Sequence, residues 1–350
     1  MNVLFLVPEY QNLYRPIVKE LENKGYKVYV IFDKLLKNDP YFNTSKINKY
    51  KRKLKNIFIS EKNIHDLYWK NYIQNNYIIN NYSFDIFFCI NGYSLSPILI
   101  NILKEKNKNI KTVLYLWDTN NYYNFNRHLP YFDRAFSFDW LDCKYNNKLT
   151  FLPFYWVEYN NYTNENKYIM SIIGTNHDNR FYIVNKIAQV LKQKKLNFYF
   201  KLFKRERDYT IRGKILYIIY TILGLKNKLF DLKLRFGKIK SELFTTQTIP
   251  QEEVVKIMSE SEYILDTDRE SQTGTTPRLI WALALNKKII TTNTNIKKLP
   301  FYDEKQIYII DRNNPNIDFI FNKINNSDLS RNEYIDHLKI DQWVNNFINI

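Results

Sequence analysis

Residues 264–293 contain two neighbouring features that could bind an anionic ligand in different ways. Asp266 and Asp268 close an apolar run, and carboxylates so placed could hold a divalent metal ion beneath the ligand. The next residues, 272–276, open a helical pattern, and the free backbone N–H groups of a helix N-terminus could hold a phosphate without metal. The two features predict the same kind of ligand but opposite metal requirements.

The residues that follow favour the helix. Pro277 is tolerated in a first turn, and either Thr275 or Thr276 could cap it. Arg278 would project from that turn, where its charge opposes the helix dipole, so an anionic ligand would explain its presence. The helix opening is therefore the more specific of the two signals.

A second loop, in residues 171–180, follows the same plan of strand, turn and helix. Gly174 would let a ligand approach the backbone, and Asp178 could cap the following helix. His177 and Arg180 could face a phosphate or a leaving group. A plain strand-to-helix turn with a solvated arginine explains the same residues equally well.

Both loops need a fold that places them beside a binding cleft. Residues 2–7 predict a buried strand, 12–25 a helix that ends at Gly25, and 26–32 the next strand. Further strands are expected at 84–90, 111–117 and 134–138. Continuous apolar strands separated by helices predict a parallel sheet covered on both faces.

A second series of elements follows the polar, asparagine-rich stretch 152–167, which suits a linker between domains. Its expected strands are 168–174, 197–203, 262–266 and 287–292, with helices near 178–193 and 275–286. The last twenty residues look like a closing helix, because their apolar side chains have the spacing of one helical face: Leu338, Ile340, Trp343, Val344 and Phe347.

This organisation predicts an α/β fold of two Rossmann-like, doubly wound domains that face a cleft. The expected parts are an N-terminal domain at 1–155, a C-terminal domain at 156–327 and a closing helix at 328–350. Ligands of such sheets bind outside the carboxyl ends of the strands, where both loops are expected.

Composition narrows the possible partners and compartment. The net charge of +17, from 52 Lys and Arg against 35 Asp and Glu, favours an acidic partner, although heavy use of Asn, Lys, Ile and Tyr suggests that codon bias contributes. Cys89 and Cys143 give no disulfide framework, and the four histidines never pair at metal-ligand spacing. The first residues lack the basic region of a signal peptide, and no apolar run approaches the roughly 18 to 20 residues of a membrane span. We expect a cytoplasmic protein, at most peripheral at a membrane.

Five segments together resemble one enzyme family. They are "YLWDTNNYYNF", "DRAFSFDWLDC", "IIGTNHDNR", "ILDTDRESQTGTTPRLIWALALNKKIITTN" and "IYIIDRNNPNI", within about residues 80–320. Their order and spacing resemble the motifs of bacterial GT-B glycosyltransferases from lipopolysaccharide and capsule biosynthesis clusters. The resemblance implies a metal-independent transferase without a cofactor, whose C-terminal domain holds a nucleotide sugar and whose N-terminal domain presents a saccharide acceptor.

The resemblance also implies where the donor binds. Gly174 and Thr175 match the first phosphate-side turn of the family, and Gln272, Thr273, Gly274 and Arg278 match the second. The helix N-terminus then holds the phosphate, and Asp266 with Asp268 is a strand end without metal. The predicted donor site comprises Gly174, Thr175, His177, Arg180, Gln272, Thr273, Gly274, Thr275 and Arg278.

One position departs from the family pattern. Relatives usually carry a glutamate where this chain has Trp281, and in many GT-B enzymes a glutamate on this helix hydrogen-bonds the nucleotide ribose. The departure implies that the ribose is held differently or that the donor is unusual.

Three carboxylates are candidates for the base that deprotonates the acceptor hydroxyl. Asp118 directly follows an apolar strand and would face the cleft. Asp139 and Glu9 stand at comparable strand ends. Asp118 is our first choice, and it could equally cap the next helix.

Residues 201–240 interrupt the alternating pattern with basic residues around "ILYIIYTILGL". Residues 204–240 could lie on an anionic membrane surface, as a lipid-linked acceptor would require, or form a buried helix with solvated flanks. Two other functions compete with transfer. The charge suggests a nucleic-acid binder, but the basic residues form no single stripe, and we expect no nucleic-acid partner. A nucleotide-sugar epimerase would share the architecture.

Overall fold

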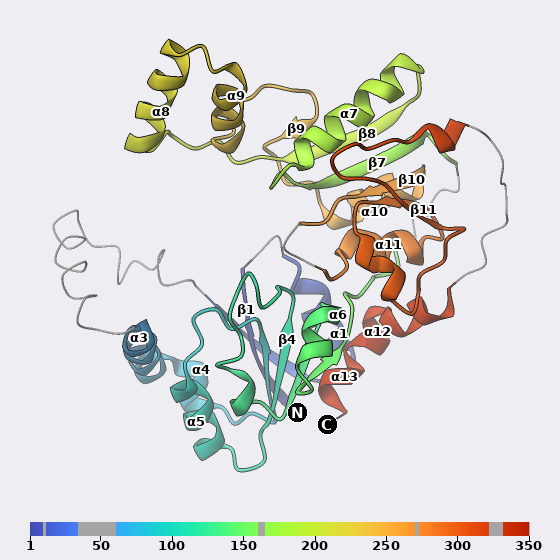
Figure 1. Ribbon diagram of the computed structural model, residues 1–350. Coiled ribbons are helices and arrows are strands. Elements are labelled where there is room, and N and C mark those ends of the chain that lie inside the picture. The colour runs from blue at the N-terminus through green and yellow to red at the C-terminus, as the bar shows by residue number, and fades with distance from the viewer. Residues whose placement is uncertain (10–11, 34–60, 160–164, 270–272, 322–331, 350) are drawn as a thin grey trace.

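Each half of the chain builds one six-stranded parallel sheet, and Figure 1 shows the two resulting domains one above the other. The computed structural model describes residues 1–9, 12–33, 61–159, 165–269, 273–321 and 332–349. The doubly wound α/β architecture that the sequence predicts is confirmed.

The N-terminal sheet has the strand order β2-β1-β3-β4-β5-β6. Its strands are β1 Asn2–Val7, β2 Lys27–Phe32, β3 Ile86–Ile90, β4 Lys111–Leu116, β5 Arg134–Ser137 and β6 Leu149–Phe151. Its helices are α1 Arg15–Asn23, α3 Glu61–Asn75, α4 Tyr77–Asn81, α5 Pro97–Lys106 and α6 Trp140–Tyr145, with a 3-10 turn at Leu129–Tyr131. The sequence predicted the first five strands and missed β6.

Strand β1 shows why this sheet is covered on both faces. Val3, Phe5 and Val7 pack into one hydrophobic cluster, whereas Leu4 and Leu6 pack into another. Because successive strand residues point to opposite faces, a strand that is apolar throughout needs a core on each side. The helices of the βαβ units supply those two cores.

The C-terminal sheet has the order β12-β11-β10-β7-β8-β9. Its strands are β7 Tyr168–Thr175, β8 Phe198–Phe203, β9 Phe244–Thr245, β10 Ser261–Asp266, β11 Lys288–Thr291 and β12 Ile307–Ile309. Its helices are α7 Arg180–Gln193, α8 Ile211–Ile222, α9 Lys226–Arg235, α10 Gln251–Ser259 and α11 Pro277–Ala284, with 3-10 turns at Thr294–Lys298 and Asp318–Phe321. β9 and β12 were not predicted.

The strand orders contain one reversal each. In the N-terminal sheet the chain continues toward one edge of the sheet after β1 and toward the other edge after β3. In the C-terminal sheet it does the same after β7 and β10. Loops that leave neighbouring strands in opposite directions open a crevice at the carboxyl ends, where ligands of such folds bind. A ligand of the C-terminal sheet is therefore expected at the carboxyl ends of β7 and β10.

The predicted single closing helix is wrong. The chain end forms a 3-10 turn, Glu333–Leu338, and two short helices, α12 Ile340–Trp343 and α13 Asn345–Ile348. Lys339 is extended, with φ −59° and ψ 140°, because it forms a β-bridge with Trp156. The segment packs on the N-terminal sheet, where the Phe347 ring stacks 4.5 Å from Phe88. It thus returns from the second domain to cover the core of the first.

Candidate active site

Arg180 lies at the strand-order reversal of the C-terminal sheet. Its side chain bridges the two strand ends: Nη1 donates to the Thr175 carbonyl at 2.6 Å, Nε donates to Thr267 Oγ1 at 2.6 Å, and Nη2 donates to the Thr267 carbonyl. Arg180 is only 4% exposed. None of the carboxylates in the described part of the chain forms an ion pair with it, so its charge is held by neutral oxygens.

Arg278 has a partner within the fold. Its Nη1 lies 2.8 Å from Asp266 Oδ1, and its Nε donates to the Ile173 carbonyl at 3.0 Å. Asp266 also accepts from Thr276 Oγ1 and Thr291 Oγ1. The buried carboxylate of Asp266 explains this arginine, so the anionic ligand inferred from the sequence is not needed to account for its presence.

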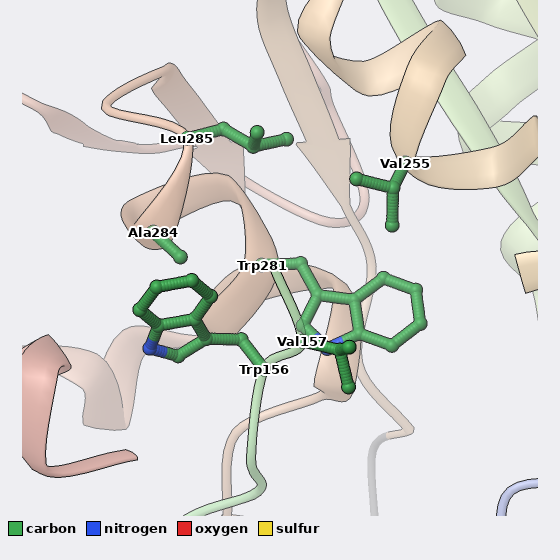
Figure 2. A pocket seen from close by; sticks show the side chains of 6 residues that line it. All are labelled: Trp156, Val157, Val255, Trp281, Ala284 and Leu285. Carbon is green, nitrogen blue, oxygen red and sulfur yellow. The ribbon is translucent and has the colours of Figure 1, made fainter. Parts of the chain in front are cut away.

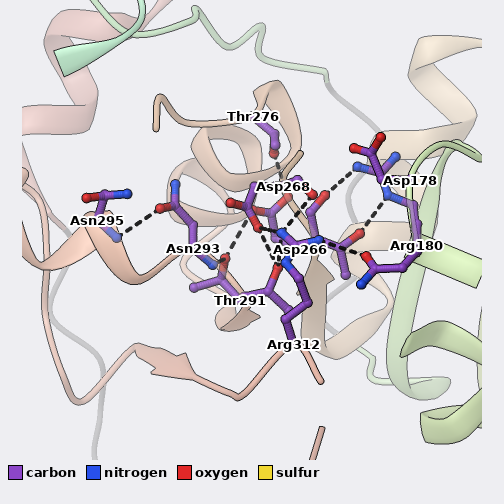
Figure 3. Close-up of polar contacts among 12 residues, drawn as sticks. Asp178, Arg180, Asp266, Asp268, Thr276, Thr291, Asn293, Asn295 and Arg312 are labelled. Atoms are coloured by element: carbon purple, nitrogen blue, oxygen red, sulfur yellow. Dashed lines mark hydrogen bonds and ion pairs between the residues drawn. The ribbon is translucent and has the colours of Figure 1, made fainter. Parts of the chain in front are cut away.

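The second carboxylate of the strand end is paired as well. Asp268 accepts from Arg312 Nη2 (Figure 3). It also accepts from Thr292 Oγ1, and Arg312 Nη1 donates to Asn179 Oδ1 at 3.0 Å. Burial raises the pKa of Asp268, with Arg312 acting against that rise. Both carboxylates of the Asp-Thr-Asp segment are therefore counter-ions of arginines. Within the described ranges no group of three His, Cys, Asp or Glu could hold a metal ion.

Positive charge dominates the space around His177. Burial, and then the charges of Arg180, Arg269, Arg278 and Arg312, lower the pKa of His177 to about 2, so its imidazole is neutral at physiological pH. Burial and neighbouring Arg278 lower the pKa of Arg180 to about 9, which still leaves it protonated at neutral pH. Four guanidinium groups outnumber the three carboxylates of Asp178, Asp266 and Asp268, which leaves an excess of positive charge at this edge.

Only a glycine at position 174 leaves room for the side chains of Arg278 and Arg180. A Cβ at this position would lie 2.4 Å from Arg278 Nη2 and 3.2 Å from Arg180 Nη1. The guanidinium groups therefore rest directly against the end of β7, where any other residue would displace them. Gly174 and Thr175, predicted to bind the donor, are thus parts of the arginine cluster: one gives it room and the other gives a carbonyl.

The loop before α11 contacts the other domain. Gln272 lies outside the described residues. The backbone N–H groups of Thr273 and Gly274 donate to Asp139 Oδ2 at 3.0 and 2.8 Å, and the Thr273 hydroxyl donates to Asp139 Oδ1. Thr276 caps α11 by accepting from the Leu279 N–H, as predicted. The N–H groups predicted to hold a phosphate hold a carboxylate of the N-terminal domain.

Asp139 is therefore an interdomain link in this conformation. It is 1% exposed and also caps α6, accepting from the N–H groups of Leu141 and Asp142. Beside it, a Cβ on Gly274 would lie 2.6 Å from the Phe138 ring, so the two domains meet closely here. This geometry favours a structural role over the general-base role considered for Asp139.

Asp118 lies at the end of β4 and faces the second domain. It accepts from Asn91 Nδ2 at 3.0 Å and from the Tyr93 hydroxyl. Burial raises its pKa, while Tyr93 and then Arg269 of the C-terminal domain act in the opposite direction. Arg269 stacks 5.1 Å from the Tyr122 ring of the N-terminal domain. Asp118 is thus a partly desolvated carboxylate within reach of the charge of the opposing domain.

Glu9, the remaining candidate, and Asp33, a further carboxylate, differ in their exposure to solvent. Glu9 is exposed after β1. Asp33, which was not predicted, is 5% exposed after β2 and accepts from the N–H groups of Tyr93 and Ser94. Burial raises the pKa of Asp33. Its position after a predicted strand is the same signal that identified Asp118.

Trp281 is a packing residue. Its indole N–H donates to the Tyr155 carbonyl at 2.9 Å, and its side chain lines a small cavity together with Trp156 and Val157 of the interdomain linker (Figure 2). The cavity that these residues line measures about 20 Å³, room for roughly one water molecule. Trp281, where the family resemblance implied a glutamate, therefore anchors the linker.

Known structures match the chain over its whole length. No protein-family model and no curated protein matches its sequence. The lipopolysaccharide outer core galactosyltransferase WaaB in its apo form aligns with 11% identity and a TM-score of 0.51, over 100% of this chain and 98% of that one. AviGT4, a glycosyltransferase involved in avilamycin A biosynthesis, aligns with 7% identity and a TM-score of 0.53, over 100% and 96%.

The chain has the GT-B fold. A UDP-GlcNAc 2-epimerase from Methanocaldococcus jannaschii also aligns, with 11% identity and a TM-score of 0.50, over 100% of this chain and 99% of that one. At these identities the likeness concerns the fold, which is the same in two kinds of sugar enzyme. The reaction has to be inferred from the site.

Proposed function

We propose that this protein is a glycosyltransferase that moves a sugar from a nucleotide-activated donor to a saccharide acceptor. The acceptor is lipid-linked, and the reaction serves the synthesis of a surface polysaccharide such as lipopolysaccharide or capsule. The observation that carries the proposal is Arg180, a buried cation at the strand-order reversal without a carboxylate partner.

The diphosphate of the donor supplies the missing counter-charge. Burying a guanidinium is costly unless an anion lies nearby, and neutral oxygens compensate only part of that cost. Arginine donates planar pairs of hydrogen bonds to phosphate oxygens, so a cluster of arginines suits a diphosphate. Asp266 and Asp268 already neutralise Arg278 and Arg312, which leaves Arg180 and Arg269 for the ligand. The guanidinium groups neutralise the diphosphate, as a bound metal ion does in metal-dependent enzymes.

Asp118 acts as the general base toward the acceptor hydroxyl. A carboxylate whose pKa is raised by burial is a stronger base than one in water, and general-base catalysis uses it to remove the proton as the new bond forms. Tyr93 and Asn91 hold the carboxylate in place.

A nucleotide-sugar epimerase is the second candidate, because an epimerase shares the fold. The two functions differ in what they need: an epimerase changes the donor alone, whereas a transferase releases the nucleotide diphosphate only when an acceptor takes the sugar. Incubating the protein with nucleotide sugars, with and without a membrane glycolipid extract, separates them by product analysis.

A thermal-shift screen of nucleotides and nucleotide sugars tests the donor site first. A ligand at a hundred times its Kd stabilises the native state by about 2.7 kcal/mol. We expect one nucleotide class to raise the Tm of the wild type, to raise that of Arg180→Ala much less, and to act equally with excess EDTA. No shift with any nucleotide, or a shift abolished by EDTA and restored by manganese, would contradict the proposal.

A further inference from the structure

Helices α8 and α9 form a hairpin that projects from the C-terminal domain, on the upper left of Figure 1. Gly213 is the buried residue of α8. The buried-helix interpretation of this segment is therefore wrong. In the described part of the chain no helix is long and apolar enough to span a membrane.

The outward face of α8 is a stripe of large aliphatic side chains, here called the α8 stripe. Its members recur at the spacing of one helical face and are 41% to 81% exposed: Ile211, Ile215, Ile218, Ile219, Ile222 and Leu223. Soluble monomers seldom leave such contiguous apolar surface in water, and where they do it marks a contact with a partner.

The opposite face of α8 is fixed by packing, so the stripe has a defined direction. The Phe236 ring packs so close to Gly213 that a Cβ there would lie 3.1 Å from it. Tyr209 packs against both Tyr217 and Phe236, with ring centroids 5.5 and 4.9 Å apart. The hairpin is therefore a built platform that presents the stripe to its surroundings.

Positive charge surrounds the stripe. Residues 204–240 contain eleven Lys and Arg against three Asp and Glu, a net charge of +8 out of +17 for the whole chain. Arg205, Arg207, Arg212 and Lys214 are exposed on α8 and just before it. Asp231, one of the three acids, accepts a hydrogen bond from the Tyr182 hydroxyl. The surface combines an apolar face with a cationic border.

We infer that α8 docks in the surface of an anionic membrane, with the α8 stripe among the acyl chains and the basic border at the lipid headgroups. A helix of twelve residues is about 18 Å long, enough to lie in the interface but not to cross it. This inference deepens the proposed function, since a lipid-linked acceptor places the reaction at the inner face of the cytoplasmic membrane, and it names the surface that holds the enzyme there.

Charge decides against the other occupants. A second copy of this chain would bring another +8 hairpin against the first, and like charges oppose that contact. A nucleic acid would contact the basic border but would leave the six aliphatic side chains exposed to water. Only a lipid surface matches the apolar face and the cationic border together.

Co-sedimentation of the full chain with vesicles tests the inference. Vesicles of phosphatidylcholine mixed with phosphatidylglycerol should bind the wild type, vesicles of phosphatidylcholine alone should bind it much less, and binding should fall as salt rises. Ile215→Glu with Ile218→Glu should lower the partition coefficient at least tenfold. The matched control is Leu67→Glu on α3, because Leu67 is 56% exposed and Ile218 is 57% exposed. It should bind like the wild type.

Replacing Arg205, Arg207, Arg212 and Lys214 by Gln should also lower binding at least tenfold, while the apolar stripe stays intact. Equal binding to neutral and anionic vesicles, or none to either, would overturn the inference. So would a wild-type dimer in sedimentation velocity that Ile218→Glu converts to a monomer. Nucleotide-induced stabilisation of the stripe variants should equal that of the wild type, so a failure of membrane binding is distinguishable from a failure of the donor site.

Discussion

The carboxyl edges of the two sheets each contain one strand-order reversal, but their chemistry is opposite. At the N-terminal edge, Asp33 and Asp118 are held by hydroxyl and amide groups, and burial raises the pKa of both. At the C-terminal edge, Asp266 and Asp268 are neutralised by arginines, and Arg180 keeps an unmatched charge. The fold fixes where the two edges meet, whereas the few residues after each strand determine that one side can take a proton and the other an anion.

Removing the carboxylate of Asp118 on the acidic side should lower turnover more than any other change considered below. Asp118→Asn preserves size and hydrogen bonding to Asn91 but removes the base, and general-base catalysis is worth roughly 10² to 10⁴ in rate. We expect turnover to fall by about that factor while donor binding, measured by calorimetry, stays within about twofold of the wild-type value, since the proposed phosphate site lies in the other domain. Glu9→Gln is the control and should retain normal turnover. If the two variants behave alike, Asp118 is not the base.

The pH dependence of kcat/KM also tests whether Asp118 is the base. A base works only when ionised, so kcat/KM should rise with pH through the pKa of Asp118, which burial places above the usual aspartate value. His128 and His177 should contribute no further transition between pH 5 and 8, because their pKa values are lowered to about 3 and about 2. The acid limb should persist in His177→Gln.

Arg278 and Arg180 are neighbours, but we expect only the replacement of Arg278 to lower the stability of the protein strongly. Arg278→Ala would leave the carboxylate of Asp266, 1% exposed, buried without its cation. Breaking a buried ion pair in this way costs about 3 to 5 kcal/mol. Urea denaturation should show that loss in the apo protein. The double variant Asp266→Asn with Arg278→Ala should recover much of it, and full stability of the single variant would contradict the pairing.

Arg180→Ala should behave differently, although the two side chains adjoin. Arg180 forms no ion pair, so under the proposed function its removal mainly deletes a contact to the donor diphosphate, worth about 1.5 to 3 kcal/mol or about ten- to a hundredfold in affinity. Calorimetric titration with the nucleotide found in the thermal screen measures it. Arg180→Lys should recover only part of the affinity, since an ammonium cannot reproduce the planar donor pair. Wild-type affinity in Arg180→Ala would remove this residue from the donor site.

The elements of the two edges could be predicted from the sequence, and most of their pairings could not. Periodicity located the long apolar strands, but β9 and β12 have two and three residues, too few to show any period. The break at Lys339 comes from a bridge to Trp156, a tertiary contact that overrides local helix propensity. Asp268 and Arg312 are 44 positions apart, and Asp139 and Thr273 are 134 apart. No local pattern connects such residues, so the sequence could suggest candidate groups but not their partners.

Asp139 joins the two edges, and replacing it distinguishes two possible binding positions for the donor phosphate. Asp139→Asn keeps the side-chain size but replaces one acceptor oxygen by an amide, which cannot accept from the N–H groups of Thr273 and Gly274. If phosphate binds at the arginine cluster, as we propose, donor affinity should stay within about twofold, whereas hydrogen exchange at residues 273–274 should accelerate by about ten- to a hundredfold, because each lost charge-assisted bond is worth about 1.5 to 3 kcal/mol. If the phosphate instead needs those same N–H groups, Asp139 competes with the donor, and Asp139→Asn should bind nucleotide more tightly than the wild type. Tighter binding would return the donor phosphate to the helix N-terminus and make Arg180 a structural cation.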